Sequence, residues 1–149
     1  MSQAIVVGSD HAGFALKEEL KRHLQHRGLP VEDLGTHSEE SVDYPVFAHA
    51  VARAIECGRA GRGVLVCGTG LGVSMAANRH PGVRAALAWD ENTARLSRAH
   101  NDANVLALGG RSLDHGLARR ILDVWLDTPF EGGRHARRVA LIEPDGATR

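Results

Sequence analysis

Short apolar runs alternate with helix-like patterns along the whole chain. The apolar runs cover residues 4–8, 31–35, 63–67, 83–89 and 104–109. Between the runs, apolar residues recur at helical spacing, as Phe14, Leu16, Leu20 and Leu24 do after the first run. Strands that are apolar on both faces are typical of a parallel sheet covered by helices on both sides. The pattern therefore predicts an α/β fold, a Rossmann-like three-layer α/β/α sandwich with a five-stranded parallel sheet.

Capping and breaking residues mark the borders of the helical segments. Asp90 and Ser112 are predicted to cap the helices that follow the fourth and fifth apolar runs. Gly132–Gly133 precede a last helix, expected at about 134–142. Nothing in the pattern indicates a second domain, so residues 1–149 are expected to form one domain. The terminal residues 146–149 are expected to be a short disordered end.

The composition excludes several classes of protein. The chain is 43% hydrophobic and 24% charged with a formal net charge of zero, which is typical of a globular protein in water. It has no basic excess for nucleic acid, and no apolar run approaches the roughly 20 residues of a membrane span. Two cysteines make no disulfide framework, and the first residues lack a signal-peptide pattern. We therefore expect a cytoplasmic protein with neither nucleic acid nor a membrane as partner.

The stretch GVLVCGTGLGVSMAAN at residues 63–78 carries the strongest chemical signal. An apolar run ends in Cys67, and glycines at every second position lead into a helix-like segment. Such a loop presents backbone N–H groups to an anion. The dinucleotide fingerprint is broken at Val73, and the lysine of phosphate loops is missing. A nucleotide-binding module stays open, with Asp90 as a ribose-binding acid, as does a turn that needs glycine only for its backbone.

Cys67 and two histidines are candidates for acid–base chemistry. Free cysteines are most often small core residues, and Cys57 fits that interpretation. Cys67 is followed by amide donors, which stabilise a thiolate and make it a usable base or nucleophile. Of the nine histidines, His11 and His100 lie beside predicted element ends with the polar neighbours Asp10 and Asn101. Histidine in such a place is a candidate acid or base near neutral pH.

The other histidines show no spacing typical of a zinc motif, and no structural metal is expected. Those expected to be solvated are His23, His26, His37, His80 and His115. In the segment GGRHARRV, Arg134 and Arg138 are four residues apart and share one helix face. They predict either a solvated basic helix or a fork that binds a phosphate.

Five motifs follow one another along about nine-tenths of the chain. They are GSDHAG at 8–13, DYP at 43–45, CGTGLGVSMAAN at 67–78, AHNDANVLALGGR at 99–111 and GGRHARRV at 132–139. Together they resemble the type B ribose-5-phosphate isomerases and the related allose- and galactose-6-phosphate isomerases. The resemblance implies an aldose–ketose isomerase of the pentose phosphate pathway that interconverts ribose 5-phosphate and ribulose 5-phosphate without a metal or organic cofactor. A six-carbon sugar phosphate is the alternative substrate.

The resemblance also implies roles for individual residues. Cys67 would be the base that carries a proton between C1 and C2 through an enediolate, with the loop amides as oxyanion donors. His100 would open the sugar ring, and Thr69 would hydrogen-bond the thiolate or a substrate hydroxyl. The residues expected to bind the substrate are Asp10, His11, Gly68, Gly70, Leu71, Gly72, Asn101, Arg111, Arg134 and Arg138.

The family's assembly adds a further expectation. The resemblance implies a homodimer, or a tetramer built from dimers, with shared active sites and a last helix that reaches the partner subunit. By the same analogy, the residues near His100 and those of the last helix would come from different chains. Some relatives use a glutamate at the position of Val73 as the base. Because Cys67 is present, the chain resembles the cysteine-using relatives.

Overall fold

Five parallel strands form a single sheet in the order β2-β1-β3-β5-β4. The computed structural model describes residues 3–145, so the expected disordered end at 146–149 lies outside the described residues. The strands are β1 (Ile5–Ser9), β2 (Val31–Asp33), β3 (Gly63–Cys67), β4 (Ala85–Leu87) and β5 (Val105–Gly109). The predicted five-stranded parallel sheet is therefore confirmed.

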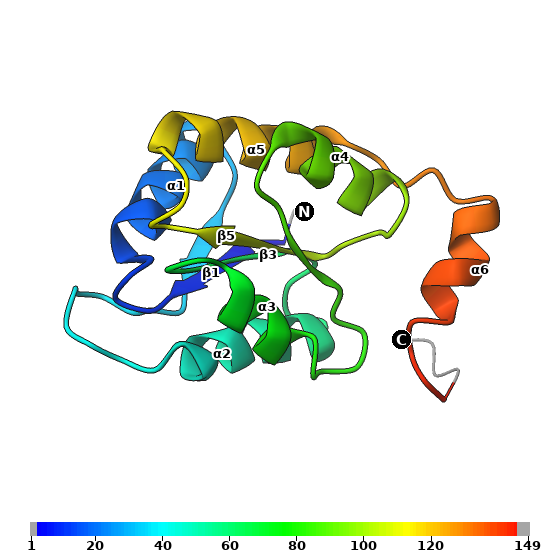
Figure 1. Ribbon diagram of the computed structural model, residues 1–149, viewed down its shortest axis with the longest axis horizontal. Coiled ribbons are helices and arrows are strands. Elements are labelled where there is room, and N and C mark those ends of the chain that lie inside the picture. Colours follow the sequence, from blue (N-terminus) through cyan, green and yellow to red (C-terminus); the bar gives the residue numbers. More distant parts are fainter. Residues whose placement is uncertain (1–2, 146–149) are drawn as a thin grey trace.

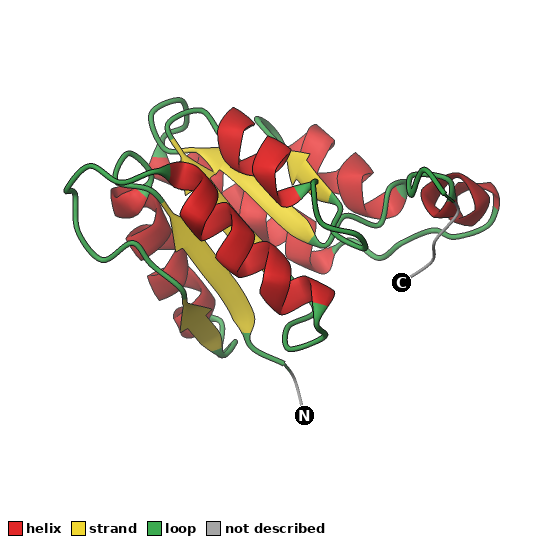
Figure 2. Cartoon of the chain, turned by 90° about the horizontal axis from the view of Figure 1, so that it is seen from below, coloured by secondary structure: helices red, strands yellow, loops and turns green. Residues whose placement is uncertain are grey.

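Helices cover both faces of this sheet (Figure 1). They are α1 (Phe14–His26), α2 (Tyr44–Glu56), α3 (Leu71–Ala77), α4 (Glu91–Ala99), α5 (His115–Asp127) and α6 (Arg134–Ala140). Helices α1, α4 and α5 lie on one face and α2 and α3 on the other, while α6 stands apart from both layers (Figures 1 and 2). Among the helices of residues 3–145, none is long and apolar enough to cross a membrane.

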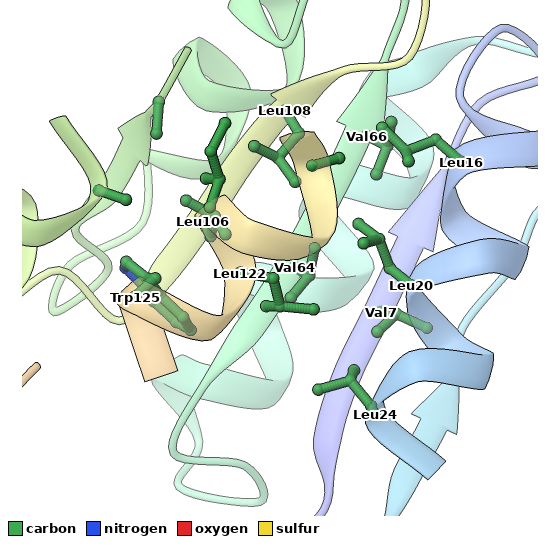
Figure 3. Packing of buried hydrophobic residues seen from close by; sticks show 14 of the residues in the cluster. Val7, Leu16, Leu20, Leu24, Val64, Val66, Leu106, Leu108, Leu122 and Trp125 are labelled. Atoms are coloured by element: carbon green, nitrogen blue, oxygen red, sulfur yellow. The ribbon is translucent and has the colours of Figure 1, made fainter. Parts of the chain in front are cut away.

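The alternation of side chains along each strand divides the core into two apolar clusters. Val64 and Val66 of β3 point toward α1 and α5, where the indole of Trp125 is fully buried (Figure 3). Leu65 and Cys67 of the same strand point the other way, toward α2 and α3. This period of two therefore sends the Cys67 side chain to the α2–α3 face of the sheet.

The predicted helix caps have different outcomes. Asp90 caps α4 as expected: its carboxylate accepts from the Thr93 backbone N–H at 2.7 Å in a capping box. The predicted cap Ser112 is wrong, because Asp114 accepts from the Leu117 N–H at 2.8 Å and begins α5. The backbone N–H of Ser112 instead donates to the Gly109 carbonyl, so a turn separates β5 from the helix.

A buried ion pair holds the carboxyl end of β1 in place. The Lys17 ammonium is 1% exposed and lies 2.7 Å from both carboxylate oxygens of Asp33 and from the Thr36 carbonyl. Ser9, the last residue of β1, donates its N–H to the Gly35 carbonyl and accepts from the Thr36 N–H. Burial alone would raise the pKa of Asp33, but hydrogen bonds from Lys17, the Gly35 N–H and Lys21 lower it overall. Helix α1 is thereby tied to the strand end that leads into the candidate site.

We expect Asp33→Asn to destabilise the protein strongly, because it leaves the buried Lys17 ammonium with only the partly exposed Glu18 carboxylate, at 3.3 Å, as its counter-charge. The loss should be about 3–5 kcal/mol in the free energy of unfolding, measured with urea at pH 7. Since the Asp33 pKa is lower in the folded protein, the difference from wild type should shrink as pH falls below about 4.

Lys21→Met is the matched control. Lys21 contacts the same carboxylate at 3.0 Å, but its side chain is 25% exposed. Its removal should cost about 1 kcal/mol or less. Equal losses in the two variants would contradict the special role of the buried lysine.

Candidate active site

Three neighbouring strands end side by side at the carboxyl edge of the sheet. Asp10 follows β1, Cys67 ends β3, and Gly110 and Arg111 follow β5. Hydrogen bonds continue past the strand ends: the Asp10 N–H donates to Val66, the Gly110 N–H to Cys67 and the Arg111 N–H to Gly68. In open α/β sheets, ligands bind beyond this edge. The structure thus brings the predicted residues of the first, third and fifth strands together.

The turn after β3 places a backbone donor on the Cys67 sulfur. The Gly70 N–H donates to Cys67 Sγ at 3.2 Å. Gly70 has φ +83°, and a Cβ there would lie 2.6 Å from the Leu87 side chain and 2.9 Å from the Leu108 backbone. Only glycine fits this turn without strain, because both the backbone angle and the space exclude a side chain. Gly70 therefore allows the tight turn that places its own N–H on Cys67 Sγ.

The next residues of the loop continue into α3. Leu71 is exposed at the start of the helix, and the Leu71 N–H donates to Thr69 Oγ1 at 3.2 Å. The Thr69 hydroxyl can still donate its own proton toward the sulfur or a ligand. A Cβ on Gly72 would lie 2.5 Å from the Tyr44 ring, so the ring of α2 closes tightly over the first turn of α3. Sequence reasoning missed Tyr44 as a part of this site.

Asp10 and His11 are oriented by backbone contacts. Asp10 is buried, and its Oδ1 accepts from the Gly13 N–H at 3.0 Å. His11 Nδ1 accepts from the Val42 N–H at 3.1 Å. This bond assigns the neutral ring proton to Nε2, which is then a donor. The loop around Val42 thus prepares His11 to donate a hydrogen bond at the carboxyl edge.

The Arg111 side chain lies over the cysteine loop. A Cβ added to Gly68 would be 3.7 Å from both Cδ and Nη1 of Arg111. Within residues 3–145, no acidic side chain forms an ion pair with this exposed guanidinium. An arginine without a carboxylate partner beside a loop of amides is suited to an anionic ligand.

The other predicted residues lie at the opposite, amino edge of the sheet. Helix α4 starts near the carboxyl edge and runs back along the sheet for about 14 Å at 1.5 Å per residue. His100 and Asn101 follow its last turn, shortly before β5 begins. Arg134 and Arg138 are exposed on α6, which lies beyond the same edge (Figure 1). One chain therefore does not bring these four residues to Cys67.

His100 packs directly on the segment that carries α6. Its ring stacks on that of His135 with centroids 4.2 Å apart and planes inclined by 10°. Burial, followed by the charges of His100 and Arg134, lowers the pKa of His135. The expectation that the His100 region and the last helix come from different chains is wrong, because chain segment 128–133 returns to the end of α4. His135 is not among the residues that the sequence predicted for the site.

Three further expectations need correction. Cys57 is exposed rather than part of the core. His23 bonds Asp123 at 2.8 Å, and His80 is held between His49 and Glu56 at 2.7 and 3.0 Å, so neither is simply solvated. Asp90 caps α4, and hydrogen bonds from the Thr93 backbone and hydroxyl lower its pKa. Its carboxylate is thereby engaged in the helix cap rather than presented to a ribose.

The fold and the carboxyl-edge cluster define a doubly wound α/β enzyme with a cysteine–amide loop. Comparison with known proteins gives the family: residues 5–142 match the Ribose/Galactose Isomerase family, and the chain belongs to it. It is 49% identical to ribose-5-phosphate isomerase B of Escherichia coli over 138 residues, 93% of each chain. A putative sugar phosphate isomerase of Bacillus subtilis is 42% identical over 93% of both chains.

Solved structures agree with this assignment. The Clostridium thermocellum ribose-5-phosphate isomerase B superposes with a TM-score of 0.93 at 53% identity, covering 94% of this chain and 95% of that one. The Thermotoga maritima protein gives 0.93 at 52% identity, with 96% and 99% covered. The protein is therefore an isomerase with the fold of these relatives.

We expect Gly70→Ala to disturb both stability and the site. The positive φ and the contacts with Leu87 and Leu108 should cost about 1–3 kcal/mol, measured by thermal unfolding, and shift the amide away from Cys67. Gly68→Ala is the control for stability, because its nearest contacts at 3.7 Å are ordinary. Equal melting temperatures for the two variants would contradict this account of the turn.

Proposed function

We propose that this protein interconverts ribose 5-phosphate and ribulose 5-phosphate through an enediolate, with Cys67 as the base. The observation that carries the proposal is the Gly70 N–H on Cys67 Sγ at 3.2 Å, within a loop that opens at the carboxyl edge. A backbone amide stabilises a thiolate by a hydrogen bond and leaves the sulfur free to accept a proton from the substrate. The name of the E. coli relative, ribose-5-phosphate isomerase B, supports the choice of substrate.

The reaction balances with Cys67 as the only carbon base. The thiolate removes the proton from C2 of the open aldose, the C–H electrons form the C1–C2 double bond, and O1 takes the negative charge. Proton transfer from O2 to O1 and return of the sulfur-bound proton to C1 then give the ketose. Backbone amides of the loop and Nε2–H of His11 are donors for the enediolate oxygens. Asp10 and Thr69 face the same edge and bind substrate hydroxyls.

Val73 cannot be the base in this chain, because its alkyl side chain has no atom that accepts a proton. Its side chain is fully buried in the cluster between α2, α3 and the sheet. Among residues 67–73, Cys67 is therefore the group we assign to proton transfer.

The complete site requires two chains in our proposal. His100, which would protonate the ring oxygen, and the phosphate ligands Arg134 and Arg138 lie at the amino edge, away from Cys67. A two-fold dimer in which the α6 arm of one subunit reaches the carboxyl edge of the other would complete both sites. Arg111 would approach the substrate from the cysteine side and Asn101 from the arm side.

Exposed apolar side chains support this pairing. Leu141 and Ile142 at the end of α6 are exposed, as are Leu71 and Met75 of α3 beside the cysteine loop. Large exposed apolar groups on both prospective partners are typical of an interface. Burying one pair against the other would bring α6 next to the glycine loop of the second chain.

Cys67→Ser should lower kcat by about 10³-fold or more, because a serine hydroxyl is a far weaker base at neutral pH. The measurement is isomerisation of ribose 5-phosphate with EDTA present, with allose 6-phosphate and galactose 6-phosphate assayed in parallel. Cys57→Ser, which changes the exposed cysteine, is the control and should keep full activity. Full turnover in Cys67→Ser would remove this residue from the mechanism.

Mixing two inactive variants tests the shared site. Cys67→Ser and His100→Asn, unfolded and refolded together in equal amounts, should regain about a quarter of wild-type activity, because half of the dimers are mixed and each has one intact site. Each variant refolded alone is the control. A mixture that stays as inactive as its parents would show that each site is built within one chain.

A further inference from the structure

A cluster of two imidazoles and a carboxylate lies where α4 ends and the α6 segment begins. His100, Glu131 and His135 each offer one ligand atom, and these atoms all lie within 4.8 Å of one another. Glu131 Oε1 is 3.8 Å from His100 Nε2 and 3.6 Å from His135 Nε2. These are the side-chain types that bind zinc and similar transition ions in proteins.

The backbone holds the three residues together before any ligand arrives. The Glu131 N–H donates to the Ala99 carbonyl at 3.0 Å, which ties the chain before α6 to the last turn of α4. The His135 N–H donates to the Gly132 carbonyl at 3.0 Å and turns the chain back over His100. The backbone positions of the three residues are therefore fixed relative to one another, and only the side chains have to adjust.

We propose that His100, Glu131 and His135 form a binding site for a divalent transition ion, with zinc as the ion of choice. Zinc bonds of about 2.0–2.2 Å place tetrahedral ligand atoms about 3.3–3.6 Å apart. The separations of 3.6 and 3.8 Å between the Glu131 carboxylate and the two imidazoles need only a small contraction, while all three ligand atoms start within 4.8 Å of one another. Solvent would take the remaining coordination position. Magnesium and calcium prefer sites built from oxygen and do not suit two imidazoles.

Binding requires one ring to turn. The lone pair of an imidazole nitrogen lies in the ring plane, so the two nearly parallel rings do not yet point at one ion. The His100 side chain is 37% exposed and that of Glu131 56%, so both have room to reorient, whereas His135 at 10% is the fixed member. The nearby guanidinium of Arg134 opposes a cation. We therefore expect weaker binding than at structural zinc sites.

The effect of zinc binding on activity rests on the proposed function, in which His100 opens the sugar ring. If His100 donates a proton to the sugar ring oxygen, an ion on its Nε2 blocks that donation. Zinc should then inhibit the isomerase reversibly, with activity restored by EDTA. Metal binding itself does not depend on the reaction, so the two claims can be measured separately.

Binding is tested with the EDTA-treated and desalted full chain, titrated with Co²⁺. We expect visible ligand-field absorption that saturates at one ion per chain and is displaced by Zn²⁺. Glu131→Gln, a surface change, should weaken binding at least tenfold. Glu39→Gln, another exposed glutamate, is the matched control and should bind as wild type does. Cys67→Ser should also bind Co²⁺ normally.

Two binding results would overturn the site. Unchanged Co²⁺ affinity in Glu131→Gln would place the ion elsewhere, for example at the His49–His80 pair. Loss of binding in Cys67→Ser would assign the ion to the thiol. For the functional claim, wild type, Glu131→Gln and Glu39→Gln are each assayed with Zn²⁺ and compared with their own uninhibited rates. Binding without inhibition would leave the metal site standing and overturn the role of His100 in ring opening.

Discussion

The hydrogen-bond ladder of β1, β3 and β5, continued beyond the strand ends, is the constraint on which the candidate site depends. The Asp10, Gly110 and Arg111 amides each bond a carbonyl of the neighbouring β3 segment, so three loops start from one rigid edge. The glycine turn can then hold a backbone N–H on Cys67 with little freedom. Lys17 of α1 holds the same edge in place through its contacts with Asp33 and Thr36. Preorganised donors of this kind stabilise developing negative charge most effectively.

The same β–α–β connections that build this edge also separate the residues of the proposed site. Each helix carries the chain back from the carboxyl edge to the amino edge, so a residue at the end of α4 must lie far from one at the end of β3. His100 is such a residue, and its stacking on His135 adds the α6 segment to its side of the molecule. If His100 and Cys67 act in one site as we propose, their separation on one chain is a geometric reason for the proposed dimer.

Much of the carboxyl-edge cluster could be predicted because it depends on local signals. An apolar strand followed by Ser9-Asp10-His11, or by Cys67 and alternating glycines, identifies a strand end whatever the rest of the chain does. The stacking of His100 on His135 could not, since it depends on how residues 128–133 return to α4. The Ser112 cap failed for a local reason: Ser112 and Leu113 lie in a turn in which both backbone N–H groups donate to the Gly109 carbonyl, so the helix begins only after Asp114. Cys57 differs from a core cysteine because its helix ends just before it.

In the proposed dimer, helix α6 would link stability to assembly. A seven-residue helix is too short to be stable by itself, and its arginines and terminal Leu141 and Ile142 are exposed. Within residues 3–145, the contacts of this arm with the sheet domain centre on the His100–His135 stack and on Glu143, which accepts from the Gly82 N–H at 2.8 Å. In the proposed dimer, the partner's loop and α3 would supply the packing that the arm lacks. Ordering of the arm, burial of its apolar end and completion of the phosphate site would then be one linked equilibrium.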